Sequence, residues 1–149
     1  MHLLEKRKTM KSIIFFFLPF LLLHCNKNEL PVNSNCDKVT VVSDSRFENA
    51  PRDDFDFVSA EIEGDCLEVA VRYGGGCGGA KFELIGNNVL KESLPLQRFV
   101  VISFDDKDNC EALIIKTLSF DLTPLQVGNT NEVAIRINGI SRTSLLYRY

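Results

Sequence analysis

Tryptophan is absent from the 149-residue sequence, and the only two histidines, His2 and His24, both precede Cys25. A chain that is cleaved before Cys25 therefore contains no imidazole. This absence excludes Ser-His-Asp and Cys-His catalysis, and it excludes zinc or copper sites that depend on histidine ligands. We therefore expect a protein that is not an enzyme and that carries no cofactor or metal.

The sequence also lacks an apolar run that could span a membrane. Its longest run is IIFFFLPFLLL (13–23), which is interrupted by Pro19, whereas a spanning helix needs roughly 20 apolar residues. Basic residues precede the run, namely Lys6, Arg7, Lys8 and Lys11. Basic residues followed by a short apolar core are typical of a secretory signal peptide, which we place at residues 1–24. Translation from Met10 would leave the mature chain unchanged.

Leu22-Leu23-His24-Cys25 resembles the cleavage site of a bacterial lipoprotein precursor. In that family a cysteine directly after the apolar core is acylated, palmitate included, and becomes the new N-terminus. His24 stands where the family usually has a small residue. The resemblance implies that Cys25 is lipidated and holds the protein to a membrane of the cell envelope. We expect this to be the outer membrane, with the protein on its periplasmic or its outer face. The alternative is an ordinary secretory signal with an unmodified Cys25.

The mature chain, residues 25–149, is short and acidic. It holds 13 basic and 19 acidic residues, a net charge of −6, and its length suits one domain. Because no basic patch offsets this charge, nucleic acid is not an expected partner. Residues 25–37 are polar and aperiodic, as in a flexible tether, and a β domain is predicted over residues 38–149.

Short runs with a period of two, separated by turn residues, indicate strands along the mature chain. In FVSAEIEG, Val58, Ala60 and Ile62 share one face, and in CLEVAVRY, Leu67, Val69, Val71 and Tyr73 do so. The strand candidates are 38–42, 57–64, 66–73, 82–85, 98–104, 112–122, 131–137 and 143–149, with turns at 63–65, 86–88, 105–109, 123–130 and 138–142. The predicted fold is all-β, an antiparallel β-sandwich of about eight strands.

Four cysteines remain in the mature domain apart from Cys25. Their even number and the oxidising compartment beyond the cytoplasm favour disulfides. Zinc is the competing use, but no two of them have the close spacing of a zinc-binding pair. Sequence alone permits three pairings. From their positions at loop and strand junctions we favour the pairs Cys36–Cys66 and Cys77–Cys110.

Two segments invite a ligand-binding interpretation. In YGGGCGGAKFEL (73–84), Gly75 and Lys81 almost match a phosphate loop, but Ala80 and Phe82 depart from it, and we interpret the segment as a disulfide-pinned turn. An acidic cluster could offer oxygen ligands to Ca²⁺, although a charged turn is the simpler interpretation. Its members are Asp105, Asp106, Asp108, Asn109 and Glu111.

Two further groups of residues are ambiguous. Asp53, Asp54 and Asp56 alternate with Phe55 and Phe57, which is typical of the solvated entry to a strand. Aromatic residues on strands could form a platform for a sugar, but they are more often core residues. Those considered are Tyr73, Phe82, Tyr147 and Tyr149.

Several segments are similar to small uncharacterised lipoproteins of Bacteroidetes. They are EGDCLEVAV (63–71), GGCGGAKFELI (75–85), LPLQR (94–98), NCEALIIKTLSFDLTPLQ (109–126) and SLLYRY (144–149). The resemblance implies a lipid anchor, an envelope location and a β-sandwich, and it implies no activity.

The leading hypothesis is a lipid-anchored envelope protein that serves as a non-enzymatic binding or structural module, with a protein or a glycan as partner. One alternative is a glycan hydrolase that uses two carboxylates in place of histidine. Another is an accessory lipoprotein that presents a ligand to an outer-membrane uptake system. The predicted site residues are Cys25 for lipidation and Cys36, Cys66, Cys77 and Cys110 for disulfides, with no catalytic residue.

Overall fold

The computed structural model describes residues 35–140 and 144–149, and the predicted signal peptide and Cys25 lie outside this range. The strands are β1 (Lys38–Val39), β2 (Val41–Val42), β3 (Asp56–Glu63), β4 (Cys66–Gly75), β5 (Ala80–Lys91), β6 (Gln97–Asp106), β7 (Ala112–Asp121), β8 (Glu132–Ile137) and β9 (Ser144–Arg148). The helix α1 spans Asp44–Asn49, and the 3-10 helix η1 spans Thr123–Leu125. Among the described residues no helix is long and apolar enough to cross a membrane.

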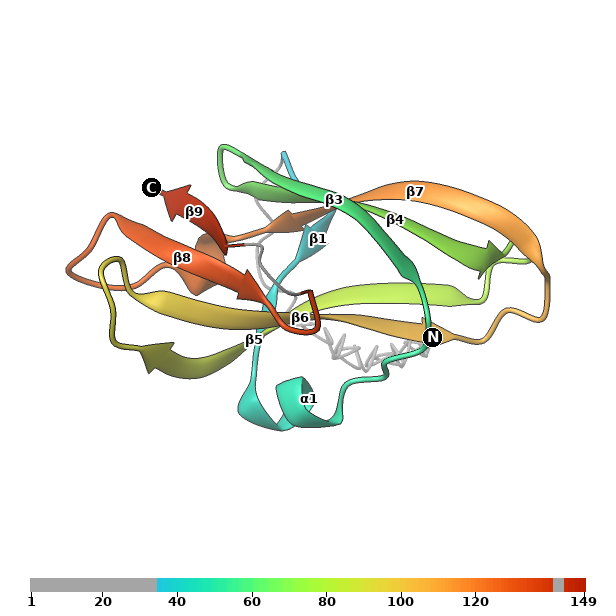
Figure 1. Ribbon diagram of the computed structural model, residues 1–149, viewed down its shortest axis with the longest axis horizontal. Coiled ribbons are helices and arrows are strands. Elements are labelled where there is room, and N and C mark those ends of the chain that lie inside the picture. Colours follow the sequence, from blue (N-terminus) through green and yellow to red (C-terminus); the bar gives the residue numbers. More distant parts are fainter. Residues whose placement is uncertain (1–34, 141–143) are drawn as a thin grey trace, which may run out of the picture.

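Two sheets pack face to face, which confirms the predicted all-β sandwich (Figure 1). Sheet A has the strand order β1-β7-β4-β3, and sheet B has the order β2-β5-β6-β8-β9. Nine strands are described where the sequence indicated about eight, and both sheets are mixed. The parallel pairs are β1 with β7, β2 with β5, and β6 with β8. The last pair is parallel because the chain crosses to sheet A as β7 before it returns to sheet B.

Alternate residues of the central strands fill the space between the sheets, as their period of two predicted. Leu67, Val69 and Val71 of β4 are completely buried, and they face Phe104 of β6 and its neighbours. Burial of each such side chain contributes about 1.5–3 kcal/mol. The core contains Leu67, Val69, Val71, Phe82, Leu84, Val100, Ile102, Phe104, Leu118, Phe120, Leu122, Leu125, Val133, Ile135, Ile137 and Tyr147.

The hairpin of β3 and β4 turns at Gly64, as predicted, but one prediction for β3 is wrong. Gly64 adopts a positive φ of 59° at the first position of a two-residue turn, where glycine is favoured. The pairing register shifts between Phe57 and Ser59, and this bulge turns Val58 outward, leaving it 56% exposed. Phe57, Ala60 and Ile62 therefore form the inward face, in place of the predicted set that began with Val58.

Three further segments differ from the sequence prediction. Residues 38–42 are two short strands in different sheets, divided at the buried Thr40, because β1 pairs with β7 and β2 with β5. The predicted turn at 86–88 lies inside β5, which absorbs it through a register shift between Gly86 and Leu90. Helix α1 was not predicted, and the Ser43 side chain caps it by accepting a hydrogen bond from the Arg46 amide.

The disulfide Cys36–Cys66, with Cα atoms 5.6 Å apart, joins the start of the described chain to the start of β4. Both cysteines are buried. This is one of the two pairs favoured from the sequence. It fixes the point at which the N-terminal segment meets the sandwich.

Candidate functional site

The glycine-rich turn between β4 and β5 is an anion-binding nest that the chain fills with its own carboxylate. The backbone amides of Gly76, Cys77, Gly78 and Gly79 donate to Oδ2 of Asp108 at 2.9, 2.9, 3.0 and 3.4 Å. Its other oxygen, Oδ1, accepts from the Cys110 amide at 3.0 Å. Converging backbone N–H groups of this kind attract anions. Asp108 therefore holds the place that a phosphate would take in a phosphate loop.

These hydrogen bonds hold the pKa of Asp108 below its usual range, and the bond from the Cys110 amide contributes most. The second favoured disulfide, Cys77–Cys110, links the nest to the segment that supplies the carboxylate, with Cα atoms 5.8 Å apart. At Gly79 a Cβ atom would lie 2.4 Å from the Lys107 carbonyl oxygen, so only glycine fits. The turn therefore has a structural role, in agreement with its interpretation as a disulfide-pinned turn.

Three members of the acidic cluster at 105–111, Asp105, Asp106 and Asp108, are engaged in local contacts. Asp105 pairs with Lys107 at 2.8 Å, and Asp106 accepts a hydrogen bond from the Asp108 amide at 2.9 Å. Of the residues that the structure describes, one group could bring three metal-ligating atoms together, Cys77, Asp108 and Cys110. Its sulfur atoms are joined to each other and its carboxylate fills the nest, so it does not fit a metal ion. The geometry favours the charged-turn interpretation over Ca²⁺.

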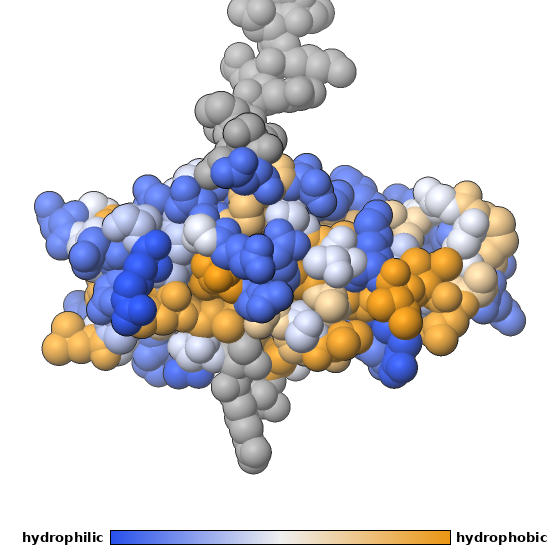
Figure 2. Space-filling model, turned by 90° about the horizontal axis from the view of Figure 1, so that it is seen from above, coloured by the Kyte–Doolittle hydropathy of each residue, from blue (hydrophilic) through white to orange (hydrophobic). Residues whose placement is uncertain are grey.

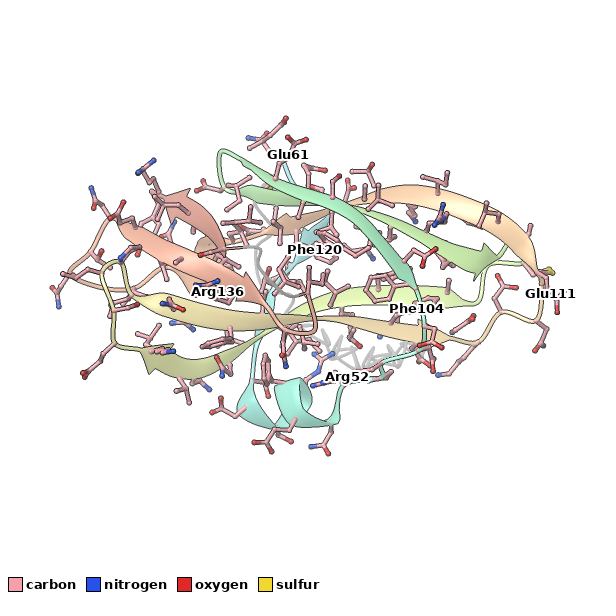
Figure 3. The ribbon with its side chains drawn as sticks, viewed as in Figure 1. Arg52, Glu61, Phe104, Glu111, Phe120 and Arg136 are labelled. Carbon is pink, nitrogen blue, oxygen red and sulfur yellow. A yellow bond between two sulfur atoms is a disulfide. The ribbon has the colours of Figure 1, made fainter. Side chains whose placement is uncertain are left out.

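A groove of about 360 Å³ opens at the flank of the sandwich, beside the beginning of β3, and we call it the edge groove. Its walls are apolar side chains of the β3 region and of β6, while Asp53 and Asp54 stand among its polar residues. It is lined by Arg52, Asp53, Asp54, Phe55, Phe57, Val101, Ile102, Asn138, Gly139 and Ile140. Figure 3 shows Arg52 and Phe104 on either side of the strand β6 that supports this region.

The chain reaches the edge groove through a short bridge to β6. Arg52 pairs with Phe104, the Asp53 amide donates to the Phe104 carbonyl at 3.1 Å, and the Phe104 amide donates to the Pro51 carbonyl at 3.2 Å. The Asp53 carboxylate then accepts a hydrogen bond from the Asp106 amide at 2.7 Å. These hydrogen bonds hold the backbone of residues 51–53 and the Asp53 carboxylate in place beside the groove.

Aromatic rings form the inner wall of the groove. The ring of Phe55 meets those of Phe82 and Phe104 edge to face, with centroids 5.6 and 6.0 Å apart. Phe82 and Phe104 stack at 4.2 Å in the core, and Tyr73 lies against both. Phe55 therefore closes the aromatic core on this flank while one side of it faces the groove. Phe82 and Tyr147 are buried and Tyr73 and Tyr149 half-buried, as core residues rather than as a sugar platform.

Strand β3, whose residue Phe57 lines the edge groove, is the last strand of sheet A and pairs with β4 alone among the described strands. Its outward face carries Glu61 and Glu63, and Glu61 lies directly opposite Glu68 of β4. None of these three carboxylates forms an ion pair with a described residue. Glu61 projects away from the sandwich near the hairpin (Figure 3). The edge thus combines an acidic outer side with an apolar inner side.

The outer face of sheet A carries an exposed apolar area that is separate from the edge groove. Leu113 and Ile115 of β7 are 69% and 72% exposed. Figure 2 looks down on this face and shows apolar residues gathered towards the end where β7 begins, with polar residues across the middle. A hollow of about 360 Å³ adjoins it, lined by Asp54, Phe55, Asp56, Arg72, Tyr73, Gly74 and Leu113. The segment 54–56 therefore lies between two hollows.

A basic hollow of about 420 Å³ lies across the 138–140 turn from the edge groove, on sheet B. Lys91 and Arg136 bring positive charge to it, and Phe99 adds an aromatic ring. The Arg136 guanidinium on β8 donates to the Gln97 side-chain oxygen on β6 at 3.2 Å. This hollow is more open to solvent than the edge groove, and none of the described polar residues that line it is buried.

Sequence reasoning missed the edge groove because its walls come from three separate segments, 52–57, 101–102 and 138–140. Its one local signal was the alternation of Asp54, Phe55, Asp56 and Phe57, interpreted as a strand entry. Asp56 does begin β3, where it pairs with Arg72 at 2.8 Å. The structure adds that the two phenylalanines, Phe55 and Phe57, also line the edge groove. The predicted lipidation site, Cys25, lies outside the described residues.

Comparison with known proteins gives a likeness of fold. No family model matches the chain, and no curated protein matches it. A NigD-like immunity protein from Bacteroides caccae has a similar structure, with a TM-score of 0.53 and 15% identity over 73% of this chain and 57% of that one. A Bacteroides vulgatus protein described as DUF1344, of unknown function, gives 0.49 and 10% identity over 75% and 54%. The chain spans little more than half the length of each.

Proposed function

We propose that this protein is a lipid-anchored module of the bacterial cell envelope that binds a polypeptide partner at the edge groove and catalyses no reaction. The observation that carries the proposal is the edge groove beside β3, which among the described strands pairs on one side only, so that apolar side chains and the outward backbone groups of β3 lie together. Many sheet proteins bind an extended peptide along an exposed edge strand, with pockets that receive its side chains.

The description of one fold neighbour is compatible with a non-enzymatic role. The Bacteroides caccae protein is described as an immunity protein, and the Bacteroides vulgatus protein as one of unknown function. Because function lies in sites rather than folds, the proposal depends on the edge groove, and the neighbours supply context only.

The hydrolase alternative is less well supported by the same groove. Glycoside hydrolysis needs two carboxylates that flank the scissile bond from opposite sides. The acidic residues that line the groove, Asp53 and Asp54, are neighbours in sequence, and Asp53 is engaged by the Asp106 amide. A module that presents a ligand to an uptake system remains compatible with the groove, and the genes adjacent to this one would distinguish it.

The proposed anchor also limits the distance between the domain and the membrane. Lipid on Cys25 would be eleven chain steps from Cys36, a reach of at most about 36–40 Å when fully extended. Cys36 is fixed to Cys66 at the start of β4, so this point of the sandwich would stay within that distance of the membrane.

The anchor is tested by replacing Cys25 with serine. The variant should appear in the soluble fraction or accumulate as precursor, because no acyl chain can attach, whereas the wild-type protein should sediment with membranes. Intact mass should show the acyl chains on the wild type alone. Equal membrane retention together with an unchanged mass would contradict the anchor.

The binding role is tested in cells with a photo-crosslinking amino acid placed at Asp54, an exposed residue of the groove. The matched control places it at Glu48, an exposed residue of α1 that does not line the groove. We expect a discrete, identifiable polypeptide adduct from position 54 and none from position 48. Absence of an adduct at position 54 under every growth condition tried would contradict the proposal.

A further inference from the structure

The free edge of β3 is suited to accept another strand. β3 is eight residues long, and within the described residues only the ladder with β4 occupies its backbone. Every second residue of an edge strand points its N–H and C=O groups away from the sheet. At the beginning of β3 these groups lie beside the edge groove, because Phe57 belongs to both.

The outer and inner faces of sheet A along this edge would favour different side chains in a strand that pairs with β3. On the outer side stand Glu61 and Glu63, with Glu68 directly across from Glu61. On the inner side the partly buried Phe57, Ala60 and Ile62 border the core. Successive side chains of a strand point to opposite faces. A matching strand would therefore alternate basic residues on the outer side with apolar residues on the inner side.

No described residue compensates for the position of Glu61 directly opposite Glu68. Like charges placed directly opposite each other on a sheet are destabilising, and no described cation neutralises either one. A broken local rule with no compensation inside the fold is typical of a functional surface. A cationic partner would supply the compensation that the described residues lack.

The same charges argue against a second copy of this chain as the occupant. Two β3 strands paired with each other would bring Glu61 and Glu63 of one copy near those of the other, and like charges across an interface are unfavourable. The net charge of the mature chain, −6, adds to this repulsion. Charge complementarity selects a basic segment instead.

We propose that the partner is an extended, basic polypeptide segment that adds to sheet A as a fifth strand along the free edge of β3. Its lysine or arginine side chains face Glu61 and Glu63, and its apolar side chains face inward, one of them filling the edge groove. This inference rests on the proposed function and names the chemistry of its partner.

The probe is a fluorescent heptapeptide in which lysine and valine alternate, titrated into the full mature protein. We expect saturable binding by anisotropy, with added amide protection on β3 in hydrogen exchange. A peptide with glutamate in place of each lysine should not bind. Binding of the glutamate peptide with equal affinity, or no saturable binding of the lysine peptide, would overturn the proposal.

Charge reversal on the protein identifies the binding surface. Glu61→Lys combined with Glu63→Lys should lower the affinity for the peptide by about tenfold or more, because the attraction between the peptide's lysines and the strand becomes repulsion. Glu111→Lys is the control, an exposed glutamate near the Asp108 nest at the far end of the domain, as Figure 3 shows. It should change affinity less than twofold. Thermal unfolding of all variants verifies that they are folded, and equal weakening by both changes would overturn the assignment.

Strand addition is separated from simple ion pairing by the backbone of the peptide. N-methylation of alternate peptide bonds removes the hydrogen bonds to an edge strand and keeps every charge, so binding should be lost. Equal binding of the methylated peptide, or displacement of the unmethylated peptide by an equal charge of spermine, would overturn strand addition. An adduct at position 54 without any peptide binding would leave the proposed function standing and reject this partner chemistry alone.

Discussion

Glu61 on β3 and Glu68 on β4 occupy directly opposed positions on the outer face of sheet A. Both side chains project from the same side of the sheet, with Glu61 exposed and Glu68 half-buried. Directly opposed cross-strand pairs contribute roughly 0.2–1 kcal/mol, favourable for unlike charges and unfavourable for like charges. The sandwich therefore carries a small, local destabilisation at its edge.

Glu61→Lys should stabilise the domain by about 0.2–1 kcal/mol, because it turns this repulsion into an attraction. Urea unfolding at low salt measures the gain, and high salt should reduce it. Glu111→Lys, which changes the net charge equally, is the control and should leave stability nearly unchanged. A destabilised Glu61→Lys variant would show that the two carboxylates are not opposed as described.

Asp108→Asn should lower the melting temperature at pH 7, because the variant loses the charge that the nest attracts. The pKa of Asp108 is lowered in the folded state, so its contribution to stability is present above the unfolded pKa, about 3.9, and is lost as pH falls through the lower folded value. The difference in melting temperature between wild type and variant should therefore shrink on acidification. A difference that stays constant from pH 7 to pH 2 would contradict the role of the charge.

The strands and turns could be predicted where the pattern was local. The alternation of Leu67, Val69 and Val71 placed β4, and Gly64 marked the hairpin. The favoured cysteine pairs also occur, since each joins a loop to a strand end that lies near it in the sandwich. These features depend on residues close together in the chain or on the even number of cysteines.

The features that escaped prediction depend on distant partners. Residues 38–42 divide at Thr40 because β7 and β5, far along the chain, offer edges in different sheets. Val58 points outward because of a bulge that no composition signal marks. The edge groove joins Phe55 and Phe57 to Val101 and to the 138–140 turn, and only the assembled fold brings them together.

Gly79→Ala should destabilise the domain by about 1–3 kcal/mol, the usual cost of forcing extra volume into a packed site. The new Cβ would lie 2.4 Å from the Lys107 carbonyl oxygen, which belongs to the backbone and cannot easily shift. Gly74→Ala is the control, because a Cβ at Gly74 meets nothing within 4 Å. It should be neutral or slightly stabilising. Equal effects of the two variants in chemical unfolding would contradict the close packing of the nest.

Replacing Cys77 and Cys110 together with serine should cost about 3.7 kcal/mol, from the chain entropy of a closed loop with a sequence separation of 33 residues. The Cys36 and Cys66 pair, with a separation of 30, should cost about the same. Unfolding in urea with and without reductant measures both. Each double variant should remain sensitive to reductant through its remaining bridge, and an insensitive variant would show that the bridge is not formed.

The hydroxyl of Tyr147 lies at the centre of a buried polar cluster. It donates to the Asp65 carboxylate at 2.6 Å and accepts from the Gln126 side chain at 2.9 Å, while the residue is completely buried. Burial raises the pKa of Tyr147, and the hydrogen bond to Asp65 raises it further. Removal of the hydroxyl leaves both partners with one hydrogen bond fewer in a region of low dielectric.

Tyr147→Phe should therefore destabilise the domain by about 1–3 kcal/mol at pH 7. Because the folded pKa is raised, the protonated phenol stabilises the fold fully below the unfolded pKa, about 10, and this contribution declines as pH rises through the folded value. The deficit of the variant should thus narrow at pH 11. Tyr73→Phe is the control, since that hydroxyl has no hydrogen bond among the described residues, and it should be nearly neutral. A Tyr147→Phe deficit that is absent at pH 7, or that grows between pH 7 and pH 11, would contradict the donor role of the Tyr147 hydroxyl.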